Sequence, residues 1–209
     1  MPFQENDIIL FQGDSITDCG RNYADPASLG SGYALMVAAQ LGLRYPEKKL
    51  TFYNRGINGN RAVDLQNRWE RDCLALQPDW VSIYIGINDT WRRYDSGYET
   101  AVEQFEASYR DLAERTLQSL GAKLIFVEPF VLSVPEDRKH WRADLDPKIH
   151  VVRSLAREYG AALVPLDGLF AQASVKAEPA FWAGDGVHPS AAGHALIAKA
   201  WLKAAGVLI

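Results

Sequence analysis

The chain has 209 residues, 48% of them hydrophobic and 23% charged, and its 22 basic and 26 acidic side chains give a net charge of −4. These proportions are typical of a soluble globular domain and exclude disordered, collagen-like and coiled-coil chains. The negative charge offers no basic surface for nucleic acid or an anionic membrane. Two cysteines, Cys19 and Cys73, are too few for a disulfide scaffold or a cysteine-rich zinc site. We therefore expect one domain over residues 1–209.

The amino-terminal segment favours a cytoplasmic location. Residues 1–7 are polar and acidic, and the apolar run after them, Ile8–Phe11, has only four residues. A signal peptide needs a basic start and about 7–15 apolar residues, and a membrane span needs about 18 or more. We therefore expect a cytoplasmic protein with two free thiols and no membrane partner.

Five short apolar segments predict β-strands. Each is almost continuously apolar, as strands are when both faces of their sheet are covered. The segments are Ile8–Phe11, Leu50–Tyr53, Trp80–Ile85, Leu124–Val127 and Ala162–Val164.

Amphipathic segments alternate with these strands and predict helices over residues 32–44, 62–76, 100–120 and 147–159, with a last helix starting at Ser190. The alternation predicts an α/β fold: a three-layer, doubly wound parallel five-stranded sheet in the flavodoxin-like order 2-1-3-4-5, with helices on both faces.

Two segments lack a regular pattern. Residues 131–147 contain two prolines and many charges, and we expect a long surface loop there. A second loop is expected over residues 168–188, between the last strand and the last helix.

Ligand sites in such sheets lie at the carboxyl ends of the strands. Strand one runs into Gly13–Thr17, strand two into residues 54–60 and strand three into residues 86–90, and residues 184–189 precede the last helix. Each of these segments places a glycine beside a small polar or titratable residue. With the order 2-1-3-4-5, Ser15 would lie between Gly59 and Asn88.

These residue types fit nucleophilic catalysis by serine. A serine hydroxyl needs a neighbouring base. Asp185 and His188 are three residues apart, so the carboxylate can orient the imidazole while its other nitrogen faces outward. The backbone N–H groups of Ser15 and Gly59 and the Asn88 amide could then hold a developing oxyanion.

Other machinery is missing from the sequence. There is no phosphate-binding GxxxxGK[ST] run, no dinucleotide fingerprint, and no G-x-S-x-G elbow of the α/β-hydrolases. Asp14, Asp185 and His188 could bind a metal in principle, but nothing in their spacing demands one. We expect neither a cofactor nor a metal.

Four segments together resemble the GDSL-type, or SGNH, hydrolase family: GDSIT at 13–17, N-x-G-x-x-G at 54–59, GIND at 86–89 and DGVH at 185–188. They occur in the family's order and span most of the chain. The resemblance implies a serine esterase with Ser15 as nucleophile, His188 as base, Asp185 as its orienting carboxylate, and Gly59 and Asn88 in the oxyanion hole. Ile16 stands where the family's short name has leucine, a volume-conserving difference.

Within the family, GDSITD followed by Cys19, and Phe181 with Trp182 before DGVHP, are similar to small bacterial carbohydrate esterases of the acetylxylan-esterase kind. This resemblance implies removal of small acyl groups, acetyl above all, from an oligosaccharide ester. Two alternatives are a lysophospholipase or thioesterase that acts on longer acyl chains, and a non-catalytic carbohydrate-binding module.

Three further residues are candidates for substrate binding. Trp91 and Trp182 fall near the expected site loops, where an aromatic ring can stack on a sugar, although core packing is the alternative. Asp14 adjoins Ser15, with local turn hydrogen bonding as its alternative role. Some members of the family assemble into homo-oligomers, but no segment here identifies an interface.

Overall fold

The computed structural model describes residues 2–208. Its centre is a five-stranded, all-parallel sheet in the order β2-β1-β3-β4-β5. This confirms the predicted fold class and strand order. The strands are β1 (Ile8–Gly13), β2 (Thr51–Asn54), β3 (Trp80–Tyr84), β4 (Lys123–Val127) and β5 (Ala162–Val164).

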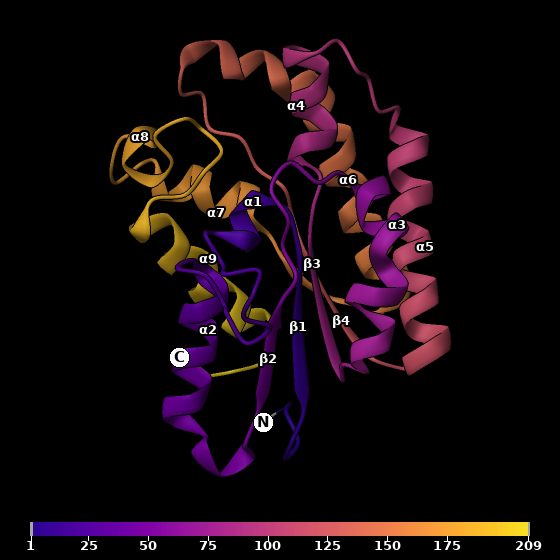
Figure 1. The fold of residues 1–209 in the computed structure, drawn as a ribbon. Helices are drawn as coiled ribbons and strands as arrows, with labels where there is room; N and C mark the ends of the chain where they lie inside the picture. Colours follow the sequence, from indigo (N-terminus) through magenta and orange to yellow (C-terminus); the bar gives the residue numbers. More distant parts are fainter. Residues whose placement is uncertain (1, 209) are drawn as a thin grey trace.

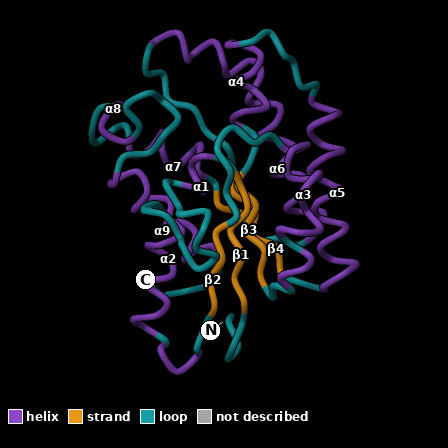
Figure 2. The backbone as a smooth tube through the Cα atoms, viewed as in Figure 1, coloured by secondary structure: helices purple, strands orange, loops and turns teal. Residues whose placement is uncertain are grey.

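Helices cover both faces of the sheet (Figure 1). The pairs in closest contact are α2 with α9 on one face, and α3 with α5 and α5 with α6 on the other. Figure 2 shows the strands as a central layer between these two groups. The helices are α1 (Ser15–Asp18), α2 (Tyr33–Arg44), α3 (Ala62–Asp72), α4 (Ile87–Asp95), α5 (Val102–Leu120), α6 (Arg142–Tyr159), α7 (Leu166–Ala173), α8 (Pro179–Trp182) and α9 (Ala191–Ala204).

The two faces of the sheet support separate apolar cores. On β1, Ile9 and Phe11 belong to one core and Leu10 belongs to the other. The same alternation occurs on β3, where Tyr84 and Ile83 point to opposite sides. All five side chains are fully buried or nearly so, which is why these strands are mostly apolar; Gln12 of β1 and Ser82 of β3 are the buried polar exceptions.

Most predicted helices agree with the structure to within a few residues at each end. The last helix follows the Ser190 N-cap, whose Oγ accepts a hydrogen bond from the Gly193 N–H at 3.2 Å. The segment predicted as one helix over 62–76 is α3 followed by a short 3₁₀ turn, Leu74–Leu76.

The prediction of a surface loop over 131–147 is wrong. Val131 and Leu132 are buried in the core, residues Glu136–Trp141 form a 3₁₀ helix, and α6 begins at Arg142. Pro147 lies inside α6, where proline normally costs about 3 kcal/mol. Burial of Leu145 and Ile149 on either side of it offsets that cost.

The prediction of a loop over 168–188 is also wrong in part, because it contains most of α7 and all of α8. A further helix, α4, follows β3 without a preceding sequence signal. It starts after Gly86, whose φ of +135° is a conformation that other residues rarely adopt. Within residues 2–208, no helix is long and apolar enough to cross a membrane.

Candidate active site

Most of the predicted site residues converge at the carboxyl end of the sheet. β1 ends at Gly13, and Ser15 is the first residue of the short helix α1. A side chain at position 13 would collide with Thr17 Oγ1 and the Tyr84 carbonyl, since a Cβ there would lie 2.3 and 2.4 Å from these atoms. Only glycine therefore allows the chain to turn this tightly from β1 into α1.

Ser15, His188 and Asp185 form a continuous chain of hydrogen bonds. Ser15 Oγ lies 2.9 Å from His188 Nε2, and His188 Nδ1 lies 2.6 Å from Asp185 Oδ2. The carboxylate fixes the ring so that Nδ1 carries a proton and Nε2 faces the serine as an acceptor. The sequence predicted this contact across 173 positions of the chain.

The turn that carries Asp185 and His188 is tied to itself and to the core. Asp185 Oδ1 accepts the backbone N–H groups of Val187 at 2.9 Å and His188 at 2.7 Å. The Leu132 N–H donates to the Gly186 carbonyl at 2.9 Å, which joins this turn to the segment after β4. The position of the His188 imidazole is thus fixed by hydrogen bonds within the turn and by the contact of the turn with Leu132.

These contacts also set the ionisation of Asp185. Partial burial opposes its negative charge, but hydrogen bonds from the His188 imidazole and from the backbone N–H groups of His188 and Val187 outweigh burial. Together they hold the pKa of Asp185 below its ordinary value. The carboxylate is therefore charged at neutral pH and can stabilise a cationic imidazole.

Three potential hydrogen-bond donors surround the serine. The Ser15 N–H lies at the amino terminus of α1, where backbone N–H groups lack helical partners. Gly59 has a φ of +77°, a backbone conformation that glycine adopts at no steric cost. The Asn88 amide donates to the Asn60 carbonyl at 3.1 Å, which ties α4 to the Gly59 loop and leaves its second hydrogen available.

These groups line one open cavity of about 620 Å³. Trp91 forms part of its wall, with its ring centroid 5.8 Å from that of His188. The cavity therefore brings together Ser15, Gly59, Asn88, Trp91 and His188. Its lining also includes Ile16, Cys19, Asn58, Arg92, Asp95, Pro189 and His194.

Asp14 lies beneath this site. It is fully buried, and its Oδ1 caps α1 by accepting the Ile16 N–H at 3.0 Å, as the local-turn alternative foresaw. Its Oδ2 is buried without a hydrogen-bond partner. Burial raises the pKa of Asp14 to about 7, against the opposing effects of the Ile16 N–H and of nearby His188.

Trp182 lies apart from Ser15. It belongs to α8 and lines a different cavity, between α7 and α9. The sequence places Trp182 six residues before His188, but α8 turns its ring away from the cavity that holds the serine.

Several residues that shape the site were not among the candidate site residues, although Asn54 begins the N-x-G-x-x-G segment. Asn54 holds α1 to β2, because its amide donates to the Thr17 carbonyl at 2.6 Å and its Oδ1 accepts the Gly56 N–H at 2.8 Å. Arg92 and Asp95 form a 2.6 Å ion pair on the cavity wall. Residues three apart lie on the same face of a helix, so this pair could have been predicted if α4 had been predicted.

His194 lines the same cavity, but both of its ring nitrogens contact neighbouring parts of the fold. Its Nδ1 accepts the Tyr33 N–H at 3.2 Å, and its Nε2 lies 3.4 Å from Cys19 Sγ. Burial, with a smaller contribution from the charge of His188, lowers the pKa of His194 to about 4. His194 is therefore neutral at physiological pH, and it contacts Cys19 at the end of α1.

The described residues contain no group of three or more His, Cys, Asp or Glu side chains placed to hold a metal ion. Around Ser15 the site offers a hydroxyl, an imidazole and several hydrogen-bond donors. A hydroxyl in contact with an oriented imidazole, beside several N–H donors, is the arrangement required for acyl transfer.

Comparison with known proteins identifies the family of this chain. Residues 11–196 match the GDSL-like Lipase/Acylhydrolase family. An acetylxylan esterase of Geobacillus stearothermophilus is 38% identical over 99% of this chain and 97% of its own length. The crystal structure of Axe2, an acetylxylan esterase from the same organism, has a TM-score of 0.92 at 36% identity and covers 100% of this chain and 98% of its own.

A second solved structure, LAE5, is described as an α/β hydrolase enzyme from the metagenome of Lake Arreo. It has a TM-score of 0.92 at 34% identity and covers 100% of this chain and 99% of its own. The family match extends over most of the chain and includes all four segments that the sequence singled out. The chain belongs to the GDSL-like lipase/acylhydrolase family.

Proposed function

We propose that this protein is a serine esterase that removes acetyl groups from a carbohydrate through an acyl-enzyme on Ser15. The hydrogen-bond chain from Ser15 through His188 to Asp185 is the observation that carries the proposal. The similarity to acetylxylan esterases over nearly the whole chain supports the choice of substrate class.

The first half of the reaction forms the acyl-enzyme. Ser15 Oγ attacks the ester carbonyl carbon while His188 Nε2 accepts the hydroxyl proton, so that no free alkoxide is needed. The charged Asp185 stabilises the imidazolium that results. His188 then delivers the proton to the leaving sugar hydroxyl, and the C–O bond to the sugar breaks.

The second half returns the enzyme to its starting state. Water enters the open cavity, His188 removes one of its protons, and the hydroxide adds to the acyl carbonyl. The proton on His188 returns to Ser15 Oγ as acetate leaves. In both halves the negative carbonyl oxygen is held by the N–H groups of Ser15 and Gly59 and by the Asn88 amide.

The walls of the cavity suit a sugar better than a long acyl chain. Asn58, Arg92 and Asp95 supply donors and acceptors for hydroxyl groups, and Trp91 supplies an aromatic ring. Sugars present hydroxyl edges and apolar C–H faces, which match such polar groups and rings respectively.

Asn88 tests the proposed oxyanion site. Asn88→Ala removes one donor, and we expect kcat for p-nitrophenyl acetate to fall by about 10²- to 10³-fold with little change in KM, because the lost interaction forms in the transition state. Asn67→Ala, on an exposed position of α3, is the matched control. A large rise in KM with kcat preserved would contradict the role of Asn88.

The substrate class is tested by the release of acetate from acetylated xylo-, rhamno- and manno-oligosaccharides. We expect release from at least one of these, together with at least a tenfold preference in kcat/KM for p-nitrophenyl acetate over p-nitrophenyl octanoate. A preference for octanoate, or release of no acetate from any of the sugars, would overturn the proposal.

A further inference from the structure

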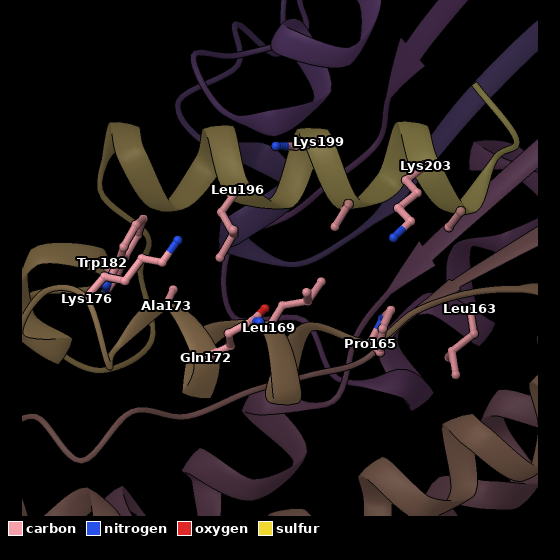
Figure 3. A pocket seen from close by; sticks show the side chains of 12 residues that line it. Leu163, Pro165, Leu169, Gln172, Ala173, Lys176, Trp182, Leu196, Lys199 and Lys203 are labelled. Atoms are coloured by element: carbon pink, nitrogen blue, oxygen red, sulfur yellow. The ribbon is translucent and has the colours of Figure 1, made fainter. Parts of the chain in front are cut away.

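A second cavity of about 600 Å³ lies between α7, α9 and the edge strand β5 (Figure 3). None of its lining residues also lines the cavity around Ser15. Its volume is within the range of small-molecule sites, which is roughly 300–1,000 Å³. It is therefore large enough for a ligand of its own, apart from the proposed esterase reaction.

The floor of this groove is apolar. Leu196, Ala200 and Ala204 recur every four residues on α9 and so form one stripe along the helix. The stripe is about 12 Å long at 1.5 Å per residue. Leu169 of α7 faces it across the groove (Figure 3). These side chains are only partly buried, so a ligand with an apolar chain would gain free energy by covering them.

The charged residues that line the groove are all lysines: Lys176, Lys199 and Lys203. Lys199 and Lys203 are one helical turn apart, a spacing at which like charges repel. Among residues 2–208, none of the three forms an ion pair with a carboxylate, although the whole chain carries a net charge of −4. The groove is thus a local positive site without a counterion from the chain.

One end of the groove holds an unmatched hydrogen-bond donor. Trp182 lies there beside Lys176 (Figure 3), and its Nε1 is buried without an acceptor. Because this N–H is itself buried, Trp182 reports on occupancy of this end of the groove and is not a donor to the ligand.

We infer that this groove binds a medium-chain carboxylate, with its alkyl chain along the α9 stripe and its carboxylate beside Lys199 and Lys203. An apolar floor with a cationic rim complements a molecule that has one apolar chain and one anionic head. A second copy of this protein is a poorer fit, because an isologous contact would bring both sets of three lysines together.

The test measures binding rather than ester turnover, so its outcome is independent of the proposed esterase activity. Decanoate, below its micellar concentration, is titrated into the protein by calorimetry, with the Trp182 indole N–H followed by NMR. Decyltrimethylammonium has the same chain length and the opposite charge. We expect decanoate to bind and to shift the Trp182 signal, and the cation to bind at least tenfold more weakly.

Variants locate the binding. The double variant Lys199→Gln, Lys203→Gln is expected to weaken decanoate binding at least tenfold, whereas Lys48→Gln, at a partly exposed position outside the groove, leaves it unchanged. Ala200→Phe fills the groove without altering charge and is expected to abolish binding.

Three results would overturn the inference. They are equal binding of the cationic surfactant, decanoate binding that survives the double lysine variant, and no detectable decanoate binding by the folded wild-type protein. Binding that survives would place the carboxylate in another cavity, such as the one around Ser15. Concentration-dependent self-association that Ala200→Phe removes would assign the groove to a second copy of the chain instead.

Discussion

Replacing Ser15 by alanine is expected to lower kcat for p-nitrophenyl acetate by roughly 10⁴- to 10⁶-fold. The variant keeps the cavity and the oxyanion donors but has no atom that can form the acyl-enzyme. Because those donors and the binding site remain, a residual rate above the uncatalysed one is expected. A serine-directed organophosphate should label the wild-type protein at Ser15 and leave the variant unlabelled.

The variant should fold normally, because alanine is a good helix former at the start of α1 and Ser15 is only half-buried. Ser31→Ala is the matched control, since Ser31 Oγ donates to the Cys19 carbonyl nearby but does not line the cavity. A Ser15→Ala protein that retains a tenth of wild-type kcat would exclude the acyl-enzyme mechanism. Thermal melting of all three proteins separates loss of chemistry from loss of fold.

The sheet and the contacts among Ser15, His188 and Asp185 could be predicted because local signals agree with the global fold. Strands buried on both faces are mostly apolar, as Ile8–Phe11 shows, and parallel strands place their following residues at one edge. Asp185 and His188 lie on one turn, so their pairing depends on a spacing of three residues. Ser15 follows β1, which ends at this edge, and His188 precedes α9, which begins there. Their side chains can therefore meet.

The parts that were predicted wrongly are those where tertiary packing overrides local propensity. Pro147 normally marks the end or start of a helix, yet α6 continues through it because Leu145 and Ile149 are buried on the core side. The helix α4 is short and rich in charged residues, and its start depends on the unusual backbone of Gly86. Neither feature gives the apolar periodicity from which helices are predicted.

Side-chain direction was the other quantity that the sequence did not supply. Trp182 is near His188 in the chain, but the four-residue helix α8 directs it to the groove between α7 and α9. Asp14 is adjacent to Ser15, but as the N-cap of α1 it points inward to the Ile16 N–H. A residue that is close in sequence to a reactive residue can thus direct its side chain away from the site, and the sequence does not reveal that direction.

The inward position of Asp14 gives the protein a pH-dependent stability. Its pKa is about 7 in the folded protein, against an ordinary value of 3.8, because burial disfavours the charged form. Below pH 3.8 both folded and unfolded chains hold the proton, and the full stability is present. As pH rises from 3.8 to 7 only the unfolded chain releases it, so stability falls, by about 4 kcal/mol in total.

Asp14→Asn is therefore expected to flatten this dependence. Asparagine is an equally good N-cap and can still accept the Ile16 N–H through its Oδ1, but it carries no charge at any pH. In urea unfolding, wild-type stability should fall between pH 5 and pH 8, and the fall should be about 2–3 kcal/mol smaller in Asp14→Asn. Asp89, whose pKa burial also raises to about 7, keeps part of the slope in both proteins.

The test compares how the free energy of unfolding changes with pH, not its absolute value. The amide introduced by Asp14→Asn would occupy the position where Asp14 Oδ2 has no hydrogen-bond partner, but any resulting loss of stability is the same at every pH and does not affect the comparison. Asp137→Asn, which changes an exposed carboxylate with 65% of its side chain accessible, should leave the wild-type slope intact. Parallel pH profiles for wild type and Asp14→Asn would mean that Asp14 ionises equally easily in the folded and unfolded chains. A charge beneath Ser15 would then be present at neutral pH, and Asp14→Asn would change activity through His188 instead of changing stability.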